Sequence, residues 1–203
     1  MHVDWKNELD RLFFVDPQFK VGNEVDEILK TAMEEEGAAI LMGMQGKGQT
    51  FKKIFGSISL KVARESDSPV FLIPEGCQYQ PIKRIIYAAN DLELDLQCIP
   101  NLIKIARPLN AEIEVVHIRH GDDYDPEEQL APKLPTYSKL TFHKPHQTEE
   151  SVLDALQSLS EQEVDLVAFA TKRRSFSEKI FHKSMVKKFA IRSHTPLLIL
   201  HGE

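Results

Sequence analysis

The sequence predicts an α/β fold: an open parallel sheet in two tandem copies, of which the first is incomplete. Three observations support this prediction. Short, continuous apolar runs alternate with amphipathic helical patterns, which is typical of strands buried on both faces of a parallel sheet. Part of the chain repeats itself at an offset of 127 residues. The second copy is preceded by strand and helix patterns that have no counterpart before the first copy.

The repeat places residues 40–73 over residues 167–200 without a gap. Both copies share the apolar pattern at each end of the stretch, and several polar positions between these ends are identical. The identical pairs are Lys52/Lys179, Ser57/Ser184, Lys61/Lys188, Ala63/Ala190, Ser66/Ser193 and Pro69/Pro196. We therefore expect the same succession of elements in both copies.

Each copy has the pattern helix, strand, variable loop, helix, strand. The first helix has its apolar residues on one face, at the spacing expected for an amphipathic helix. In the first copy the expected elements are helix 23–36, strand 38–42, helix 55–65 and strand 70–73. In the second copy they are helix 149–162, strand 165–169, helix 183–193 and strand 197–200.

Further elements precede the second copy. We expect a strand over 83–89, a helix over 94–109, a strand over 112–119, a polar loop over 121–135 and a strand over 137–142. Pro100 and Pro108 are expected to bound or kink the helix, because proline lacks the N–H that a helix needs. With these elements the second copy forms a complete five-stranded β/α unit.

The first copy lacks counterparts of residues 83–127 and has only an expected edge strand near 11–21 in front of its first helix. Its sheet would have an open edge. We expect this half either to be a fragment or to borrow structure from the second half or from another chain. The predicted domains are a partial one over 1–74, a linker over 75–81 and a complete one over 82–203.

Composition narrows the class of protein. The 203 residues carry a formal net charge of −6, with 42% hydrophobic and 28% charged residues, which suits a packed soluble domain. No apolar stretch reaches the ~18 residues of a membrane helix, and no leader is recognised at the N-terminus. Two cysteines make no disulfide framework. The basic residues of 172–192 alternate with apolar ones at helical spacing. We therefore expect a cytoplasmic protein without membrane or nucleic-acid partners.

The glycine-rich segment Gly43-Met44-Gln45-Gly46-Lys47-Gly48-Gln49-Thr50 follows an apolar strand and precedes a helix that begins near Gly56 and Ser57. Glycines allow the backbone to approach an anion closely, and a helix N-terminus offers unpaired N–H groups to phosphate oxygens. Lys47, Lys52 and Lys53 add positive charge. The residues alone predict either a phosphate-binding loop or an ordinary strand-to-helix connection.

The segment fits neither a Walker loop nor a dinucleotide fingerprint, because Phe51 stands where the latter needs glycine. The spacing Gly43-x2-Gly46-x9-Gly56-Ser57, flanked by the two apolar runs and by Pro69, resembles the motif of the universal stress protein family. This resemblance extends over the whole chain, as one truncated and one full copy.

The resemblance implies an open, Rossmann-like sheet with strand order 3-2-1-4-5 and units paired along their last strands. The pairing would form a homodimer or an intramolecular pseudo-dimer. It also implies ATP, with Mg²⁺ if ATP is bound, and a nucleotide as the partner. The phosphates would lie against Gly43, Gly46, Lys47, Gly56 and Ser57.

The second copy has the first strand, whose end in this family carries an acidic nucleotide contact, and Asn90 or Asp91 takes that position. Its loop has lost the glycines, since Ala170, Arg173 and Lys183 replace them and Ser184 remains. We expect a degenerate second site at Asn90, Asp91 and Ser184.

Three function classes remain open: a nucleotide-binding stress-response module, a slow ATPase or self-phosphorylating protein, and a dimerising scaffold that binds no nucleotide. We favour the first and expect no efficient enzyme, because no base or metal-binding carboxylate is recognised. The histidine pairs His117/His120 and His143/His146 have no cysteine at a metal-site spacing, so no metal site is predicted.

Overall fold

The structure is a computed structural model, and it describes residues 16–35, 37, 39–44, 57–89, 91–117, 125–143, 164–172 and 195–202. The expected helices over 149–162 and 183–193 lie outside these residues, as does most of the loop after Gly43.

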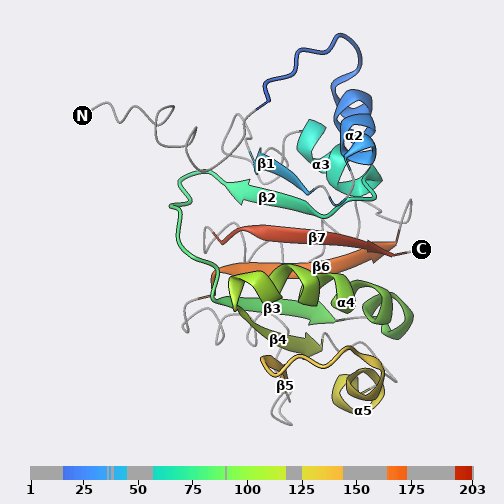
Figure 1. Ribbon diagram of the computed structural model, residues 1–203, viewed down its shortest axis with the longest axis vertical. Coiled ribbons are helices and arrows are strands. Elements are labelled where there is room, and N and C mark those ends of the chain that lie inside the picture. The colour runs from blue at the N-terminus through green and yellow to red at the C-terminus, as the bar shows by residue number, and fades with distance from the viewer. Residues whose placement is uncertain are drawn as a thin grey trace.

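Seven strands form one sheet in the order β1-β2-β7-β6-β3-β4-β5 (Figure 1). The bounds of the strands are β1 Ile40–Met44, β2 Val70–Pro74, β3 Arg84–Ala89, β4 Glu112–His117, β5 Leu140–His143, β6 Leu166–Lys172 and β7 Leu197–Gly202. Numbered along the second half of the chain, β5-β4-β3-β6-β7 is the order 3-2-1-4-5. The predicted open α/β sheet is therefore confirmed, and so is its strand order in that half.

Every neighbouring pair of strands is parallel except β2 and β7. These two strands pair antiparallel, with Val70 opposite Ile199, Phe71 opposite Leu198 and Leu72 opposite Leu197. They are the last strands of the two predicted copies, so within the chain they pair as a pseudo-dimer would. β1 is the edge strand of this half of the sheet in the described part of the chain. The division into domains at residues 75–81 stays a prediction.

Two helices cover one face of the sheet at β1 and β2 (Figure 1). Helix α2, Glu24–Glu34, begins at Asn23, whose side chain accepts hydrogen bonds from the N–H groups of Val25 and Asp26. This N-cap and the acidic first turn explain why the helix starts there. Helix α3 spans Ser57–Glu65 and buries Val62 and Ala63 against the strands.

Helix α4, Leu92–Leu109, covers the opposite face at β3, β6 and β7 (Figure 1). Asp91 caps its N-terminus, and Asn110 ends it in the left-handed conformation with φ 54°. The helix continues through Pro100, in agreement with the expected range 94–109, so of the two alternatives for this proline the one in which it bounds the helix is wrong. Ile99 and Leu102 are fully buried on either side, and this burial outweighs the missing hydrogen bond.

Two further predictions need correction. Residues 125–133 of the expected loop form helix α5, Pro126–Leu130, and the short 3-10 helix η2, Ala131–Lys133. Asp125 caps α5 and Pro126 stands in its first turn, which are helix-start signals. The expected edge strand near 11–21 is wrong for residues 16–21, which form no strand. In the second half, the edge strand β5 lies next to β4. The described residues of the first half contain no strand equivalent to β4, so residues 16–21 have no neighbouring strand to pair with.

Candidate functional site

The predicted phosphate-binding loop connects a strand to a helix. β1 ends at Met44 and α3 begins at Ser57, so the setting expected for the loop is present at both of its ends. Gly46, Lys47 and Gly56 lie outside the described residues, and of Ser57 the structure describes only its place at the start of α3. The carboxyl edge of a parallel strand followed by a helix N-terminus is where α/β sheets bind anionic groups.

Gly43 is the loop glycine that the structure describes. It pairs with Ile73 in the parallel ladder of β1 and β2. A Cβ atom built on Gly43 would meet no atom of the described residues within 4 Å, so they leave the space beside its backbone open. Glycine is therefore not required here by packing within the described chain, which leaves close approach of an outside group as a reason for it.

The two groups of predicted site residues lie at opposite edges of the sheet. Because β2 and β7 pair antiparallel, the carboxyl ends of β1 and β2 point away from those of β3, β6 and β7 (Figure 1). Gly43 stands at the first edge, and Asp91, which follows β3, stands at the second. The chain therefore does not bring Gly43 and Asp91 together into one site.

Asp91 is half-buried and belongs to a hydrogen-bonded group at the N-terminus of α4. Its Oδ1 accepts from the N–H of Leu94 at 3.1 Å, and its own N–H donates to Oδ2 of Asp95 at 3.1 Å. Oδ1 of Asp95 accepts from the hydroxyl of Tyr87 at 2.6 Å. Asp95 and Tyr87 are both fully buried. Asn90 and Ser184, the other residues predicted for this second site, lie outside the described residues.

Burial also determines the chemistry of Cys98, one turn after Asp95. Burial, and secondarily the Asp95 carboxylate, raise the pKa of the Cys98 thiol to about 12. The thiol is therefore neutral at physiological pH and unreactive as a nucleophile. Cys77, in the segment after β2, is the other free cysteine and is partly exposed.

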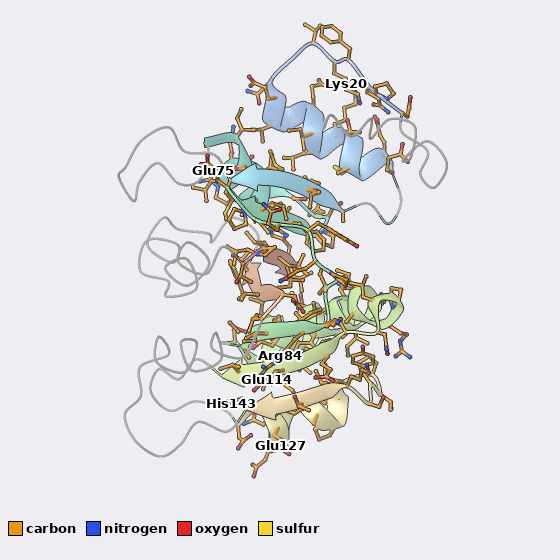
Figure 2. All side chains as sticks on the ribbon, turned by 90° about the vertical axis from the view of Figure 1, so that its left-hand side faces the viewer. Lys20, Glu75, Arg84, Glu114, Glu127 and His143 are labelled. Carbon is orange, nitrogen blue, oxygen red and sulfur yellow. The ribbon has the colours of Figure 1, made fainter. Side chains whose placement is uncertain are left out.

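A charged cluster on β3, β4 and β5 was not predicted. A guanidinium nitrogen of Arg84 lies 2.6 Å from Oε2 of Glu114, and Nδ1 of His143 lies 3.1 Å from Oε1 of the same carboxylate (Figure 2). A hydrogen bond at the second contact requires the proton on Nδ1. The sequence signal that could have revealed this cluster is the presence of a charged residue, Arg84 or Glu114, within each of the two apolar strands β3 and β4. In the described residues, no group of three or more histidine, cysteine or acidic side chains could hold a metal ion.

The strand order, with its crossover between β3 and β6, defines an open, doubly wound α/β protein. The model of the universal stress protein family matches residues 14–74, which contain the whole glycine loop, so this part of the chain belongs to that family. No curated protein matches the sequence.

Solved structures share the fold of the chain as a whole. A universal stress protein from Archaeoglobus fulgidus DSM 4304 is 15% identical with a TM-score of 0.62, and the match covers 99% of this chain and 80% of that one. A putative universal stress protein from Pseudomonas aeruginosa UCBPP-PA14 is 16% identical with a TM-score of 0.60, over 98% of this chain and 76% of that one. A Pseudomonas aeruginosa PAO1 protein of unknown function has 15% identity, a TM-score of 0.60 and coverages of 98% and 75%.

These likenesses show the fold. They bear out the predicted family fold, while the nucleotide and the site residues stay predictions. No helix in the described residues is long and apolar enough to cross a membrane.

Proposed function

We propose that this protein is a nucleotide-binding module of the universal stress protein type, and that ATP is its ligand. The observation that carries the proposal is the position of the glycine loop, between the carboxyl end of β1 and the start of α3. This loop lies inside the segment that the family model matches. The open space beside Gly43 also supports the proposal, because phosphate oxygens need close access to the backbone.

In the proposed complex, the triphosphate lies against Gly43, Gly46 and Gly56, with main-chain N–H groups as donors. The N-terminus of α3 adds its dipole, and Ser57 adds a hydroxyl donor. Lys47 contributes positive charge. Mg²⁺ bound together with ATP would neutralise part of the phosphate charge. None of these residues is a general base, so the proposed role is binding and not efficient catalysis.

The second copy contributes at most a separate and weaker site at Asn90, Asp91 and Ser184. The Asp91 carboxylate is already engaged as the N-cap of α4, and the opposite directions of the two strand sets keep it away from Gly43 at the end of β1. The proposal therefore assigns ATP to the first half of the chain, in a cytoplasmic protein with two free thiols.

Calorimetric titration of the full chain with ATP and Mg²⁺ tests the proposal. We expect saturable binding that Gly46→Val abolishes, because a side chain fills the loop, and that Ser57→Ala weakens by about tenfold, as for the loss of one charge-assisted hydrogen bond. Ser184→Ala is the matched control, since it removes the equivalent hydroxyl of the second copy and should leave the affinity unchanged. Equal affinities of the wild type and Gly46→Val would refute the site.

A non-nucleotide-binding scaffold is the second candidate. The observation that favours it is the antiparallel pairing of β2 with β7, which joins the last strands of the two halves in one sheet. A folded protein that takes up no ATP at millimolar concentration would support the scaffold. Steady phosphate release that is absent from Gly46→Val would instead support slow hydrolysis.

A further inference from the structure

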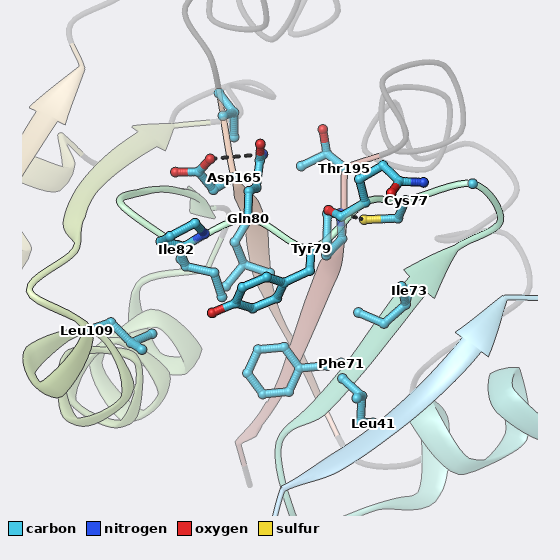
Figure 3. A pocket seen from close by; sticks show the side chains of 16 residues that line it. Leu41, Phe71, Ile73, Cys77, Tyr79, Gln80, Ile82, Leu109, Asp165 and Thr195 are labelled. Atoms are coloured by element: carbon cyan, nitrogen blue, oxygen red, sulfur yellow. Dashed lines mark hydrogen bonds between the residues drawn. The ribbon is translucent and has the colours of Figure 1, made fainter. Parts of the chain in front are cut away.

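The face of β1 and β2 opposite α2 and α3 is apolar, and no helix of the described residues covers it. Leu41 of β1 is 70% exposed, and Phe71 and Ile73 of β2 are half-buried on the same face. Alternation along the strands places these three side chains away from the core cluster that α2 and α3 close. Figure 3 shows them side by side at the floor of a cavity.

The cavity has a volume of about 730 Å³. Its walls are the segment that follows β2 and the C-terminal end of α4, which contribute the 94% exposed Tyr79 and the half-exposed Leu109 (Figure 3). Asp165 is the single charged residue among the described ones that line it. Its carboxylate accepts hydrogen bonds from the Gln80 amide and from the N–H groups of Lys83 and Arg84. The surface offered to a partner is therefore apolar, with a polar rim that carries the single negative charge of Asp165 among its described residues.

The internal repeat shows what covers the equivalent surface in the second half. The residues 127 positions after Leu41, Phe71 and Ile73 are Ala168, Leu198 and Leu200, and all three are at most 2% exposed. They belong to the core cluster that α4 closes with the side chains of Leu94, Cys98, Ile99 and Leu102. The same face of the first half has kept its apolar residues, and no helix of the part of the chain that the structure describes lies over them.

The two surfaces are continuous. β2 and β7 are neighbours in one sheet, and Phe71 already packs against the edge of the cluster beneath α4. A helix laid over β1 and β2 would extend this existing helix-on-sheet interface by one more helix. An amphipathic helix is therefore the occupant whose shape and chemistry fit the surface.

The described helices of a second copy cannot supply it. The apolar side of α4 is buried against its own sheet, and α2 and α3 pack against theirs. Helix α5 has five residues and is too short to cover three strand positions.

We propose that the face formed by Leu41, Phe71 and Ile73 docks an amphipathic helix of a partner protein, related to α4 by the symmetry of the two halves. The helix carries apolar residues at i, i+3, i+4 and i+7 toward the sheet and no charge at its centre. This interaction needs no nucleotide, so it stands whether or not the glycine loop binds ATP.

A fluorescein-labelled peptide with the sequence of Leu92–Leu109, carrying Cys98→Ser against oxidation, is the probe. We expect saturable binding to the full chain by fluorescence anisotropy. Leu41→Lys should weaken it at least about tenfold, because a charge then lies on the apolar floor. Met33→Lys is the matched control: Met33 is 73% exposed on α2, which lies over the other face, and this variant should bind as the wild type does. A peptide carrying Leu102→Ser and Ile103→Ser should not bind.

Three results would overturn the proposal. The first is peptide binding that Leu41→Lys leaves unchanged. The second is a dimer in sedimentation velocity that Leu41→Lys dissociates, since a second copy then occupies the face. The third is a wild-type chain that binds no peptide. In that case, urea denaturation shows whether the chain covers this face itself: Leu41→Lys would then unfold at a lower urea concentration than Met33→Lys.

Discussion

Phe71 and Leu198 stand directly opposite each other in the antiparallel ladder of β2 and β7, and they are also each other's equivalents in the 127-residue repeat. The neighbouring pairs in the ladder are Val70 with Ile199 and Leu72 with Leu197. Because the repeat makes Leu72 the equivalent of Ile199 and Val70 the equivalent of Leu197, each of these two pairs is the symmetry image of the other. An approximate two-fold axis therefore passes between Phe71 and Leu198, perpendicular to the sheet. Rotation about this axis reverses the strand direction from one half to the other, and it keeps equivalent side chains on the same face of the sheet.

This pairing predicts unequal costs for truncating the two side chains. Leu198 is fully buried, so Leu198→Ala should lower the free energy of unfolding by about 2–4 kcal/mol through lost burial and a cavity. Phe71 is half-buried on the open face, so Phe71→Ala should cost less than Leu198→Ala although the lost side chain is larger. Urea denaturation followed by circular dichroism measures both. A greater loss for Phe71→Ala would mean that the face over β1 and β2 is covered in solution.

The buried hydrogen bond between Tyr87 and Asp95 provides a second prediction. Tyr87→Phe keeps the ring in place and removes the hydroxyl that donates to Oδ1 of Asp95 at 2.6 Å. The buried carboxylate then loses a donor, and the free energy of unfolding should fall by about 1–3 kcal/mol. Tyr79→Phe is the control, because Tyr79 is 94% exposed, and it should stay within about 0.5 kcal/mol of the wild type. Equal urea midpoints for the two variants would contradict the structural role of the pair.

Substitution of two glycines at strand ends by alanine should have different effects on the free energy of unfolding. A Cβ atom on Gly202 would lie 2.5 Å from Cδ1 of Leu94 and 2.7 Å from Oε1 of Gln97, so these two side chains of α4 would have to shift. Gly202→Ala should therefore cost about 1 kcal/mol or more, since Leu94 is held in the core.

The methyl group of Gly43→Ala meets no atom of the described residues within 4 Å, so this variant should leave the free energy of unfolding unchanged within about 0.5 kcal/mol. Thermal unfolding of the two variants side by side checks both expectations. A Gly43→Ala variant as unstable as Gly202→Ala would mean that other parts of the chain fill the space beside the glycine loop.

Local patterns made much of this fold predictable. The strands of the second half follow from continuous apolar runs, and α2 follows from its amphipathic pattern after Asn23. The sequence left open whether Pro100 bounds or kinks the helix, because a proline effect is local, whereas the burial of Ile99 and Leu102 that offsets it depends on the sheet. Helix α5 was missed although Asp125 and Pro126 are start signals, because its single turn is too short to show a period.

The site was harder to predict than the fold. The glycine spacing identified the loop and its strand-to-helix setting, but not the edge of the sheet on which Asp91 lies. That edge depends on the antiparallel register of β2 with β7. The paired residues, such as Phe71 and Leu198, lie far apart in the sequence, so no local pattern encodes this register. The cluster of Arg84, Glu114 and His143 was missed for the same reason, since the three residues meet only across neighbouring strands.

The two cysteines should differ sharply toward alkylating reagents. Because the pKa of Cys98 is raised to about 12, the fraction of thiolate at pH 8 is on the order of 10⁻⁴, and α4 and the sheet block access to the sulfur. Iodoacetamide at pH 8 should therefore modify Cys77, which is partly exposed, and leave Cys98 unmodified until the protein unfolds. Mass spectrometry of the native and urea-unfolded chain gives one and two additions, respectively. Cys77→Ser is the control, since it should remove the native addition entirely. Rapid alkylation of Cys98 in the folded Cys77→Ser variant would mean that α4 opens from the sheet far more often than its buried contacts imply.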